Sequence, residues 1–261
     1  MKIAVVGKGG VGKTTIAGTL ARLLARDGFN VIAVDADPSL NLSSALGIPQ
    51  EIAMNLRPLA ENVELMRSRV QVGFGGLLNL TPKVDDIVDR FGVVGPDGVK
   101  LLVMGTVRSG GSGCLCPENA FLRALMSHLL LGRKDVVIMD MVAGLEHLGR
   151  GTARGVDLML CVVEPSVKAI ETARRVMELS RDIGVKNVAA VANKVLSEED
   201  SEYVKEGLSA IGLELLGLIP FDKSVIKADR KGVALLDYAP KSPVVKSIKE
   251  LERELLKRYL G

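Results

Sequence analysis

A glycine-rich segment near the start of the chain has the residue types that hold a nucleoside triphosphate. The run Gly7-Lys8-Gly9-Gly10-Val11-Gly12-Lys13-Thr14-Thr15 satisfies G-x-x-x-x-G-K-[ST] between an apolar strand-like run and a helical pattern. Glycines let backbone N–H groups turn inward around a β-phosphate, and the helix N-terminus adds positive potential. We expect Lys13 to reach the β- and γ-phosphates and the Thr14 hydroxyl to bind magnesium. The residues expected to contact ATP or ADP here are Gly9, Gly10, Val11, Gly12, Lys13, Thr14 and Thr15.

The same segment carries a second lysine, Lys8, near its start. Lys8 cannot easily reach the phosphates of its own chain if Lys13 is already there. The loop resembles that of the deviant Walker A class, which includes septum-site and plasmid-partition ATPases, nitrogenase iron protein and metal-cluster assembly ATPases. The resemblance implies a homodimer with ATP between the subunits, in which Lys8 stabilises transition-state charge in trans, as an arginine finger does. The alternative is a solvated loop lysine.

Carboxylates follow two of the apolar runs. Asp35 and Asp37 end the run at residues 31–34, and this spacing suits contacts to magnesium-bound water and the positioning of an attacking water. In the resembled class the second carboxylate lies in switch I, so we expect Asp37 to orient the lytic water and Asp35 to lie in the outer shell of magnesium. The alternative for both is an Asx turn before Pro38. Asp140 ends the run at residues 136–139 in a Walker B pattern and is expected to hold a magnesium-bound water.

Two later strand ends are candidates for recognition of the base. Asn193 follows the apolar run at residues 188–192, and its side-chain amide offers both a donor and an acceptor to adenine. Pro220 and Phe221 follow the run at residues 215–219. The resembled class reads the base with the backbone after such a proline.

A pair of cysteines, Cys114 and Cys116, lies between glycines and Pro117. Two thiols at i and i+2 are too close for an ordinary disulfide, but they can converge on one soft metal ion if the backbone turns. Two ligands leave the metal incompletely coordinated, because structural zinc takes four, and a two-fold axis would double them. We therefore expect one Ni²⁺ or Zn²⁺ shared across a dimer. The alternative is two small buried residues near a helix start. Cys161 lies inside an apolar strand-like run, and we expect it to be a core residue.

Together these motifs make the resemblance specific. Four segments are similar to those of the carbon monoxide dehydrogenase maturation ATPases. They are the phosphate loop, Asp35-Ala36-Asp37-Pro38, Gly110-Gly111-Ser112-Gly113-Cys114-Leu115-Cys116-Pro117 and Asp140-Met141-Val142-Ala143-Gly144-Leu145-Glu146-His147. The similarity runs over nearly the whole chain and is weakest at residues 50–98. It implies a cytoplasmic homodimer that assists nickel insertion into carbon monoxide dehydrogenase, or into its complex with acetyl-CoA synthase.

Alternating strand and helix patterns must position these residues. We expect strands at residues 3–6, 31–34, 100–104, 136–139, 158–163, 188–192 and 215–219. We expect helices at residues 14–26, 118–131, 167–183, 202–211 and 243–260. Short apolar strands separated by helices predict an α/β fold, a P-loop NTPase with a mostly parallel central sheet flanked by helices on both faces. We expect one domain over residues 1–261, with the ligand edge at the carboxyl ends of the strands. Loops and a hairpin are expected in residues 73–98.

Composition narrows the classes of partner. The chain has 261 residues, and Lys and Arg number 34 against 31 for Asp and Glu, a balance too mild to predict attraction to nucleic acid or membranes. Aromatic residues make up 3% and there is no Trp, which disfavours a stacking platform for single strands. Three Cys make no disulfide framework, and the start of the chain reads as a strand rather than a signal peptide. We therefore expect a cytoplasmic protein with no nucleic-acid or membrane partner.

Two other classes share the phosphate loop. A partition or septum-positioning scaffold would need a basic surface or a membrane-seeking helix, whereas the apolar face of residues 243–260 is flanked by charges of both signs, which favours a helix packed on the sheet. An iron–sulfur carrier related to nitrogenase iron protein would need a second Cys after switch II. Residues 141–150 contain none, and the Cys-x-x-Cys spacing of iron–sulfur scaffolds is not that of Cys114 and Cys116.

Overall fold

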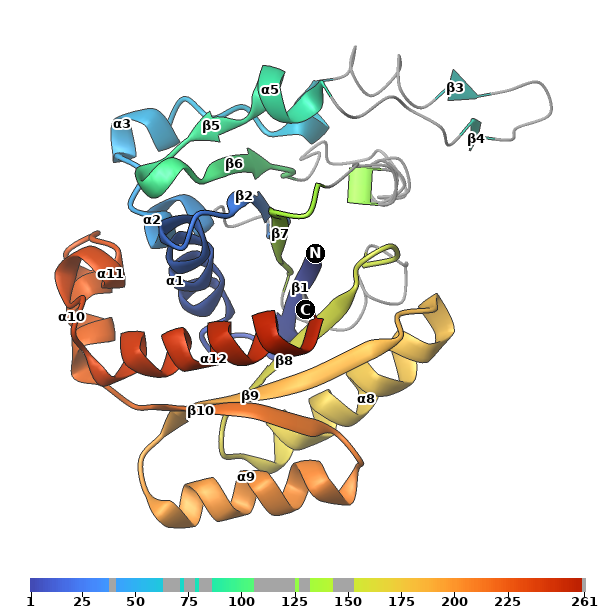
Figure 1. The fold of residues 1–261 in the computed structure, drawn as a ribbon, viewed down its shortest axis with the longest axis vertical. Coiled ribbons are helices and arrows are strands. Elements are labelled where there is room, and N and C mark those ends of the chain that lie inside the picture. The colour runs from blue at the N-terminus through green and yellow to red at the C-terminus, as the bar shows by residue number, and fades with distance from the viewer. Residues whose placement is uncertain are drawn as a thin grey trace, which may run out of the picture.

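A central sheet organises the computed structural model, which describes residues 1–37, 41–62, 71–72, 78–79, 86–105, 125–126, 132–142 and 153–259. The sheet has eight strands in the order β10-β9-β8-β1-β7-β2-β6-β5 (Figure 1). All neighbouring pairs are parallel except β5–β6, which is antiparallel. The strands are β1 (Lys2–Gly7), β2 (Asn30–Asp35), β5 (Val93–Val94), β6 (Lys100–Val103), β7 (Asp135–Asp140), β8 (Leu158–Val163), β9 (Asn187–Val195) and β10 (Glu214–Pro220). A separate antiparallel pair joins β3 (Gln71–Val72) and β4 (Leu78–Asn79).

Helices cover both faces of this sheet, as the sequence predicted. One face packs against α1 (Lys13–Arg26) and α12 (Pro243–Tyr259), and the other against α8 (Val167–Ile183) and α9 (Glu198–Ala210) (Figure 1). The shorter helices are α2 (Leu42–Leu46), α3 (Gln50–Ala53), α5 (Ile87–Phe91), α10 (Lys223–Arg230) and α11 (Leu235–Tyr238), with 3₁₀ turns η1 (Leu59–Glu61) and η2 (Pro96–Gly98).

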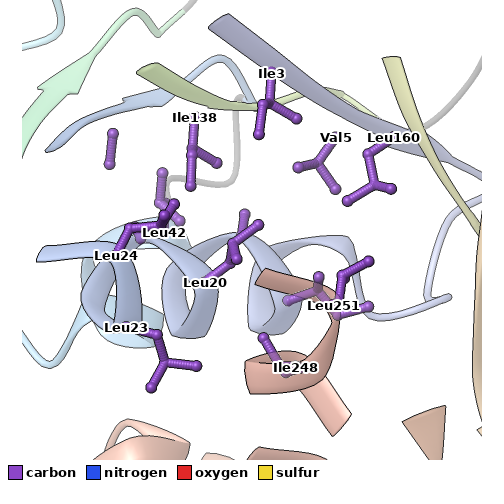
Figure 2. Close-up of a cluster of buried hydrophobic side chains, with 14 of the residues drawn as sticks. Ile3, Val5, Leu20, Leu23, Leu24, Leu42, Ile138, Leu160, Ile248 and Leu251 are labelled. Atoms are coloured by element: carbon purple, nitrogen blue, oxygen red, sulfur yellow. The ribbon is translucent and has the colours of Figure 1, made fainter. Parts of the chain in front are cut away.

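Side chains of the central strands alternate between two buried clusters. Ile3 and Val5 of β1 pack with α1 and α12, whereas Ala4 and Val6 face the cluster that includes residues of α8 and α9. This alternation is the period of two that a strand requires. Figure 2 shows Leu20 of α1 and Leu251 of α12 beside each other below the strands. The apolar face of α12 is therefore buried against α1 and the sheet, the packing expected from its mixed-charge flanks.

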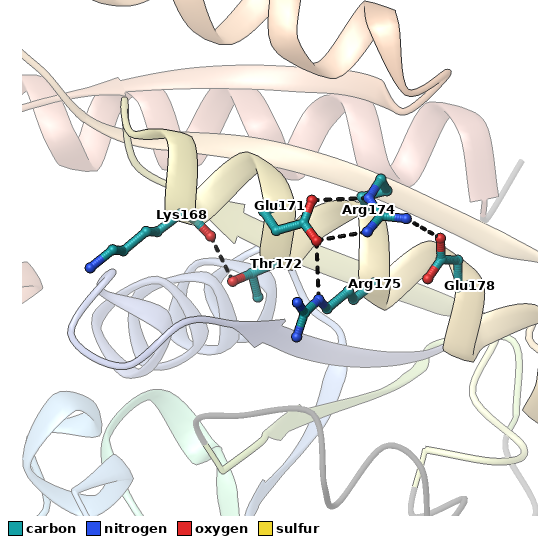
Figure 3. A network of polar contacts seen from close by, with 6 residues as sticks. All are labelled: Lys168, Glu171, Thr172, Arg174, Arg175 and Glu178. Carbon is teal, nitrogen blue, oxygen red and sulfur yellow. Dashed lines mark hydrogen bonds and ion pairs between the residues drawn. The ribbon is translucent and has the colours of Figure 1, made fainter.

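The outer face of α8 carries ion pairs rather than apolar groups. Glu171 pairs with both Arg174 and Arg175, and Arg174 also contacts Glu178 at 2.5 Å (Figure 3). All of these side chains are exposed, and exposed pairs one turn apart contribute only about 0.3–0.5 kcal/mol each. Burial of the opposite face against the sheet therefore stabilises the helix more than this network does. The buried residues of that face are Ala169, Ala173, Val176, Ser180 and Ile183.

The expected elements match the structure within a few residues where it describes them. Helix α9 begins at Glu198 rather than at residue 202, because the Ser197 hydroxyl accepts a hydrogen bond from the Asp200 N–H and caps the helix earlier. Of the helix expected at residues 118–131, the structure describes only Leu125 and Met126, which are helical. The short helices α2, α10 and α11 were not predicted. No described helix combines the length and apolar composition needed to cross a membrane.

Candidate functional site

The phosphate loop joins β1, in the middle of the sheet, to α1. Gly12 precedes the helix with φ +98°, in the left-handed region that glycine tolerates. A Cβ atom at this position would lie 2.3 Å from Nδ2 of Asn193, which follows the apolar core of β9. The tight approach of these two segments therefore depends on a glycine at residue 12.

Three side chains donate hydrogen bonds to carbonyl oxygens of this loop. The bonds run from Lys13 to Lys8 (3.2 Å), from Lys194 to Gly10 (2.6 Å) and from Asn193 to Val11 (2.7 Å). Among the described residues, no hydrogen bond engages the backbone N–H groups of Gly9, Gly10 or Gly12. These N–H groups therefore have no protein acceptor among the described residues and are available to bind an anion, as a phosphate cradle requires.

A hydroxyl and a carboxylate meet below the loop. Thr14 Oγ1 donates to Asp140 Oδ2 at 2.6 Å. Asp140 Oδ1 is buried and accepts no hydrogen bond from any residue that the structure describes. Burial raises the pKa of Asp140 to about 6, although the Thr14 hydrogen bond and the charge of Lys13 act to lower it. A hydroxyl beside a carboxylate oxygen without a partner fits Mg²⁺, which prefers oxygen ligands and keeps several waters.

Lys13 lies near two of the three predicted carboxylates, Asp140 and Asp37. Burial lowers the pKa of Lys13, and the charges of Asp140 and Asp37 oppose this effect. The structure thus brings Lys13, Thr14, Asp37 and Asp140 together at the carboxyl edge of the sheet. Pro38, which follows Asp37, lies outside the described residues.

The carboxylate of Asp35, expected in the outer shell of magnesium, binds two backbone N–H groups. Oδ1 accepts from the Asp37 N–H at 3.1 Å and Oδ2 accepts from the Leu42 N–H at 3.0 Å. Asp35 is fully buried, and burial raises its pKa to about 7, opposed by the Leu42 hydrogen bond. Asp35 thus binds the backbone at Asp37 and at Leu42, the first residue of α2.

A groove of about 400 Å³ extends from the phosphate loop between α1 and the α10–α11 segment. This volume lies within the range of small-molecule sites. The lining residues are Gly10, Gly12, Thr14, Thr15, Thr19, Asn41, Ser44, Ala45, Lys194, Val225, Ile226, Ala228, Asp229, Val233, Ala234 and Leu235. The groove therefore adjoins the phosphate cradle and is large enough for a small molecule such as a nucleoside.

The residues expected to read the base do not line this groove. Asn193 uses its Nδ2 on the Val11 carbonyl, and the Phe221 N–H donates to the Val195 carbonyl at 2.9 Å. Pro220 and Phe221 are not among the residues that line the groove. The wall comes instead from α10 and α11, which the sequence pattern did not indicate.

Sequence reasoning also missed Glu164, which follows β8. Its Oε1 lies 3.4 Å from Lys8 Nζ, and its Oε2 lies 3.6 Å from Lys194 Nζ. The only sequence signal was a charged residue directly after an apolar strand.

The cysteine pair, Cys114 and Cys116, lies outside the described residues, as do residues 143–152, where switch II was expected. Among the residues that are described, no group of three His, Cys, Asp or Glu could hold a metal ion. Cys161 is fully buried, as expected, and burial raises the pKa of its thiol to about 12.

The fold and the site define a P-loop ATPase. Residues 2–236 match the CobQ/CobB/MinD/ParA nucleotide binding domain, and the chain belongs to this family. A chain of the MinC:MinD cell division protein complex of Aquifex aeolicus has the same fold, with a TM-score of 0.72, 22% identity and coverage of 98% of this chain and 96% of that one.

Within this family the chain is similar to a protein of carbon monoxide metabolism. It is 46% identical to the carbon monoxide dehydrogenase accessory protein CooC of Rhodospirillum rubrum, over 92% of this chain and 91% of that protein. It is also 46% identical to an uncharacterized ATP-binding protein of Methanocaldococcus jannaschii, over 89% of this chain and 90% of the relative. These similarities confirm the resemblance to the maturation ATPases that the motifs indicated.

Proposed function

We propose that this chain is a cytoplasmic, ATP-dependent maturation factor that works as a homodimer and assists nickel insertion into carbon monoxide dehydrogenase or its complex with acetyl-CoA synthase. The observation that carries the proposal is the 46% identity to CooC over 92% of the chain. The geometry of the phosphate loop adds support, because Lys13, Thr14 and Asp140 are assembled for hydrolysis of a nucleoside triphosphate.

In this proposal each residue of the site has one task. The N–H groups of the loop and Lys13 bind the β- and γ-phosphates, while Thr14 and Asp140 hold magnesium and its water. Bound magnesium supplies neutralisation of charge on the phosphate oxygens. Asp37 positions the attacking water, and Lys8 of the second subunit stabilises the charge that develops on the transferred phosphoryl group.

The position of Lys8 supports action on a second subunit. Its side chain is 41% exposed, and its ammonium group pairs with Glu164 rather than with its own loop. Lys8→Ala should therefore bind MgATP but not dimerise productively around it, so its ATP-dependent dimer should be weaker than that of wild type in light scattering. Mixing Lys8→Ala with Lys13→Ala should restore activity, because a heterodimer pairs one intact Lys8 with one intact Lys13. An unchanged dimer with full activity in Lys8→Ala would refute this role.

Nickel or zinc is the proposed cargo of Cys114 and Cys116, with four thiolates from two chains around one ion. Cys114→Ser or Cys116→Ser should each abolish a stoichiometry of one metal per dimer, measured by elemental analysis. Cys161→Ala is the matched control, because this buried thiol has a raised pKa and should not bind metal. One tightly held metal per monomer that survives both substitutions would show that the ligands lie elsewhere.

The function itself is tested by activation of the client enzyme. Nickel-free carbon monoxide dehydrogenase should gain activity faster when incubated with Ni²⁺, MgATP and this protein. Lys13→Ala, which lacks the phosphate-binding ammonium, should give only the rate seen without the protein. Equal activation by wild type and Lys13→Ala would contradict an ATP-dependent role.

A further inference from the structure

Glu164 lies between two lysines at the mouth of the phosphate loop. Its two carboxylate oxygens lie 3.4 Å from Lys8 Nζ and 3.6 Å from Lys194 Nζ. Its side chain is 24% exposed, less than that of either lysine. One carboxylate therefore joins the end of β8 to the loop after β1 and to the end of β9.

The two lysines differ in how firmly they are held. Lys194 also donates to the Gly10 carbonyl at 2.6 Å, and its backbone adopts φ +61°, a conformation that only surrounding structure maintains in a lysine. Within the described part of the chain, Glu164 is the only partner of the Lys8 ammonium. Loss of Glu164 would thus leave Lys194 anchored but release Lys8.

We propose that Glu164 is a positioning residue that retains Lys8 on its own subunit until ATP brings a second copy of the chain. This inference rests on the proposed action of Lys8 in trans. A lysine that crosses to the partner's nucleotide must first leave Glu164. The triphosphate of the partner carries more negative charge than the single carboxylate of Glu164, so the exchange is favourable only when ATP is bound.

The loss of the Lys8–Glu164 ion pair shifts the dimerisation equilibrium modestly towards the monomer. An exposed ion pair changes an equilibrium by about 1.4- to 5-fold, and a symmetric dimer breaks two such pairs. Removal of the carboxylate should then strengthen the ATP-dependent dimer by about 2- to 30-fold. The effect should shrink in 0.5 M salt, because exposed charges are screened there.

The test measures the dimer dissociation constant by analytical ultracentrifugation with Mg²⁺ and a non-hydrolysable ATP analogue. Glu164→Gln should dimerise at lower concentration than wild type, and Glu164→Ala should shift in the same direction. Glu198→Gln is the control, since it removes an exposed pair with Lys205, 3.8 Å away on α9. Lys194→Met should weaken nucleotide binding without strengthening the dimer.

Combination with Lys8→Ala separates this inference from the proposed function. Glu164→Gln should have no effect on the dimer in the Lys8→Ala background, because the carboxylate acts through that lysine. If Lys8→Ala itself leaves dimerisation unchanged, the proposed role of Lys8 fails. Suppose instead that Lys8→Ala weakens the dimer. The role of Glu164 is then overturned if Glu164→Gln does not strengthen the dimer of the otherwise wild-type chain, or if it strengthens the dimer equally in the Lys8→Ala background.

Discussion

A methyl group added at Gly12 would break the contact that holds the phosphate loop against β9. The new Cβ would lie 2.3 Å from Asn193 Nδ2, so the hydrogen bond from this amide to the Val11 carbonyl could not survive. Alanine would also be held at φ +98°. The Gly12→Ala variant therefore tests whether the observed loop geometry is the one that binds ATP.

The expected cost follows from three terms. Left-handed backbone costs about 1–2 kcal/mol for alanine, and loss of the hydrogen bond costs about 0.5–1.5 kcal/mol. Alanine also lowers the conformational entropy of the unfolded chain, which raises the free energy of unfolding by about 0.4–1 kcal/mol. The free energy of unfolding should then fall by about 1–3 kcal/mol, or about 3–10 °C in melting temperature. MgATP affinity should fall at least about tenfold, because the N–H groups around residue 12 are displaced.

Gly10→Ala is the matched control. Gly10 has φ +76°, but a Cβ atom there meets nothing within 4 Å, so this variant carries the backbone strain without the collision. Melting temperature by differential scanning calorimetry and affinity by isothermal titration should both rank wild type, Gly10→Ala and Gly12→Ala in that order. Adding Asn193→Ala to Gly12→Ala should cost less than the sum of the single changes, because the colliding amide is gone. Equal MgATP affinity in Gly10→Ala and Gly12→Ala would refute the reasoning.

Three other perturbations probe binding, packing and pH dependence. Lys13→Ala should abolish ATP hydrolysis and weaken nucleotide binding by at least about tenfold in a filter-binding assay; normal turnover would contradict its assignment. Arg22 is buried and pairs with Asp97 and Asp237, which are 21% and 42% exposed. Arg22→Met should lower the free energy of unfolding in urea by about 2–3 kcal/mol, less than for a fully buried pair, and a loss below about 1 kcal/mol would count against this. Glu252 is fully buried, and burial raises its pKa above that of the unfolded chain. The neutral carboxyl is therefore the form that the folded state favours, and the stability that it contributes is lost as pH rises through the raised pKa. Glu252→Gln should thus gain stability over wild type from pH 4 to pH 8 in thermal melts, and a gap independent of pH would argue otherwise.

Local patterns in the sequence were sufficient for the phosphate loop and for the seven strands that pair in parallel. Apolar runs of four to six residues predict buried parallel strands, and a glycine motif between strand and helix predicts the cradle. Thr14 and Asp140 were expected at one site because the carboxyl ends of parallel strands share an edge. Their contact at 2.6 Å confirms this expectation.

Short helices escaped prediction because tertiary contacts stabilise them. Helix α11 has four residues, and isolated helices of this length do not form in water. Burial of Leu235 and Leu236 and the pairing of Asp237 with Arg22 hold it in place. The groove wall that α10 and α11 provide was therefore invisible in the local pattern.

The sequence by itself determined which chemistry the chain carries, because the loop motif and the terminal carboxylates are local signals of residue type and spacing. Only the tertiary structure decided where the polar side chains are used. Asp35 binds backbone N–H groups, Asn193 binds the Val11 carbonyl, and Glu164 joins two lysines. Lys8 and Glu164 are 156 residues apart, and they meet because β1 and β8 are neighbours in the sheet. Strand order results from packing of the whole chain, so no local pattern specifies such a contact.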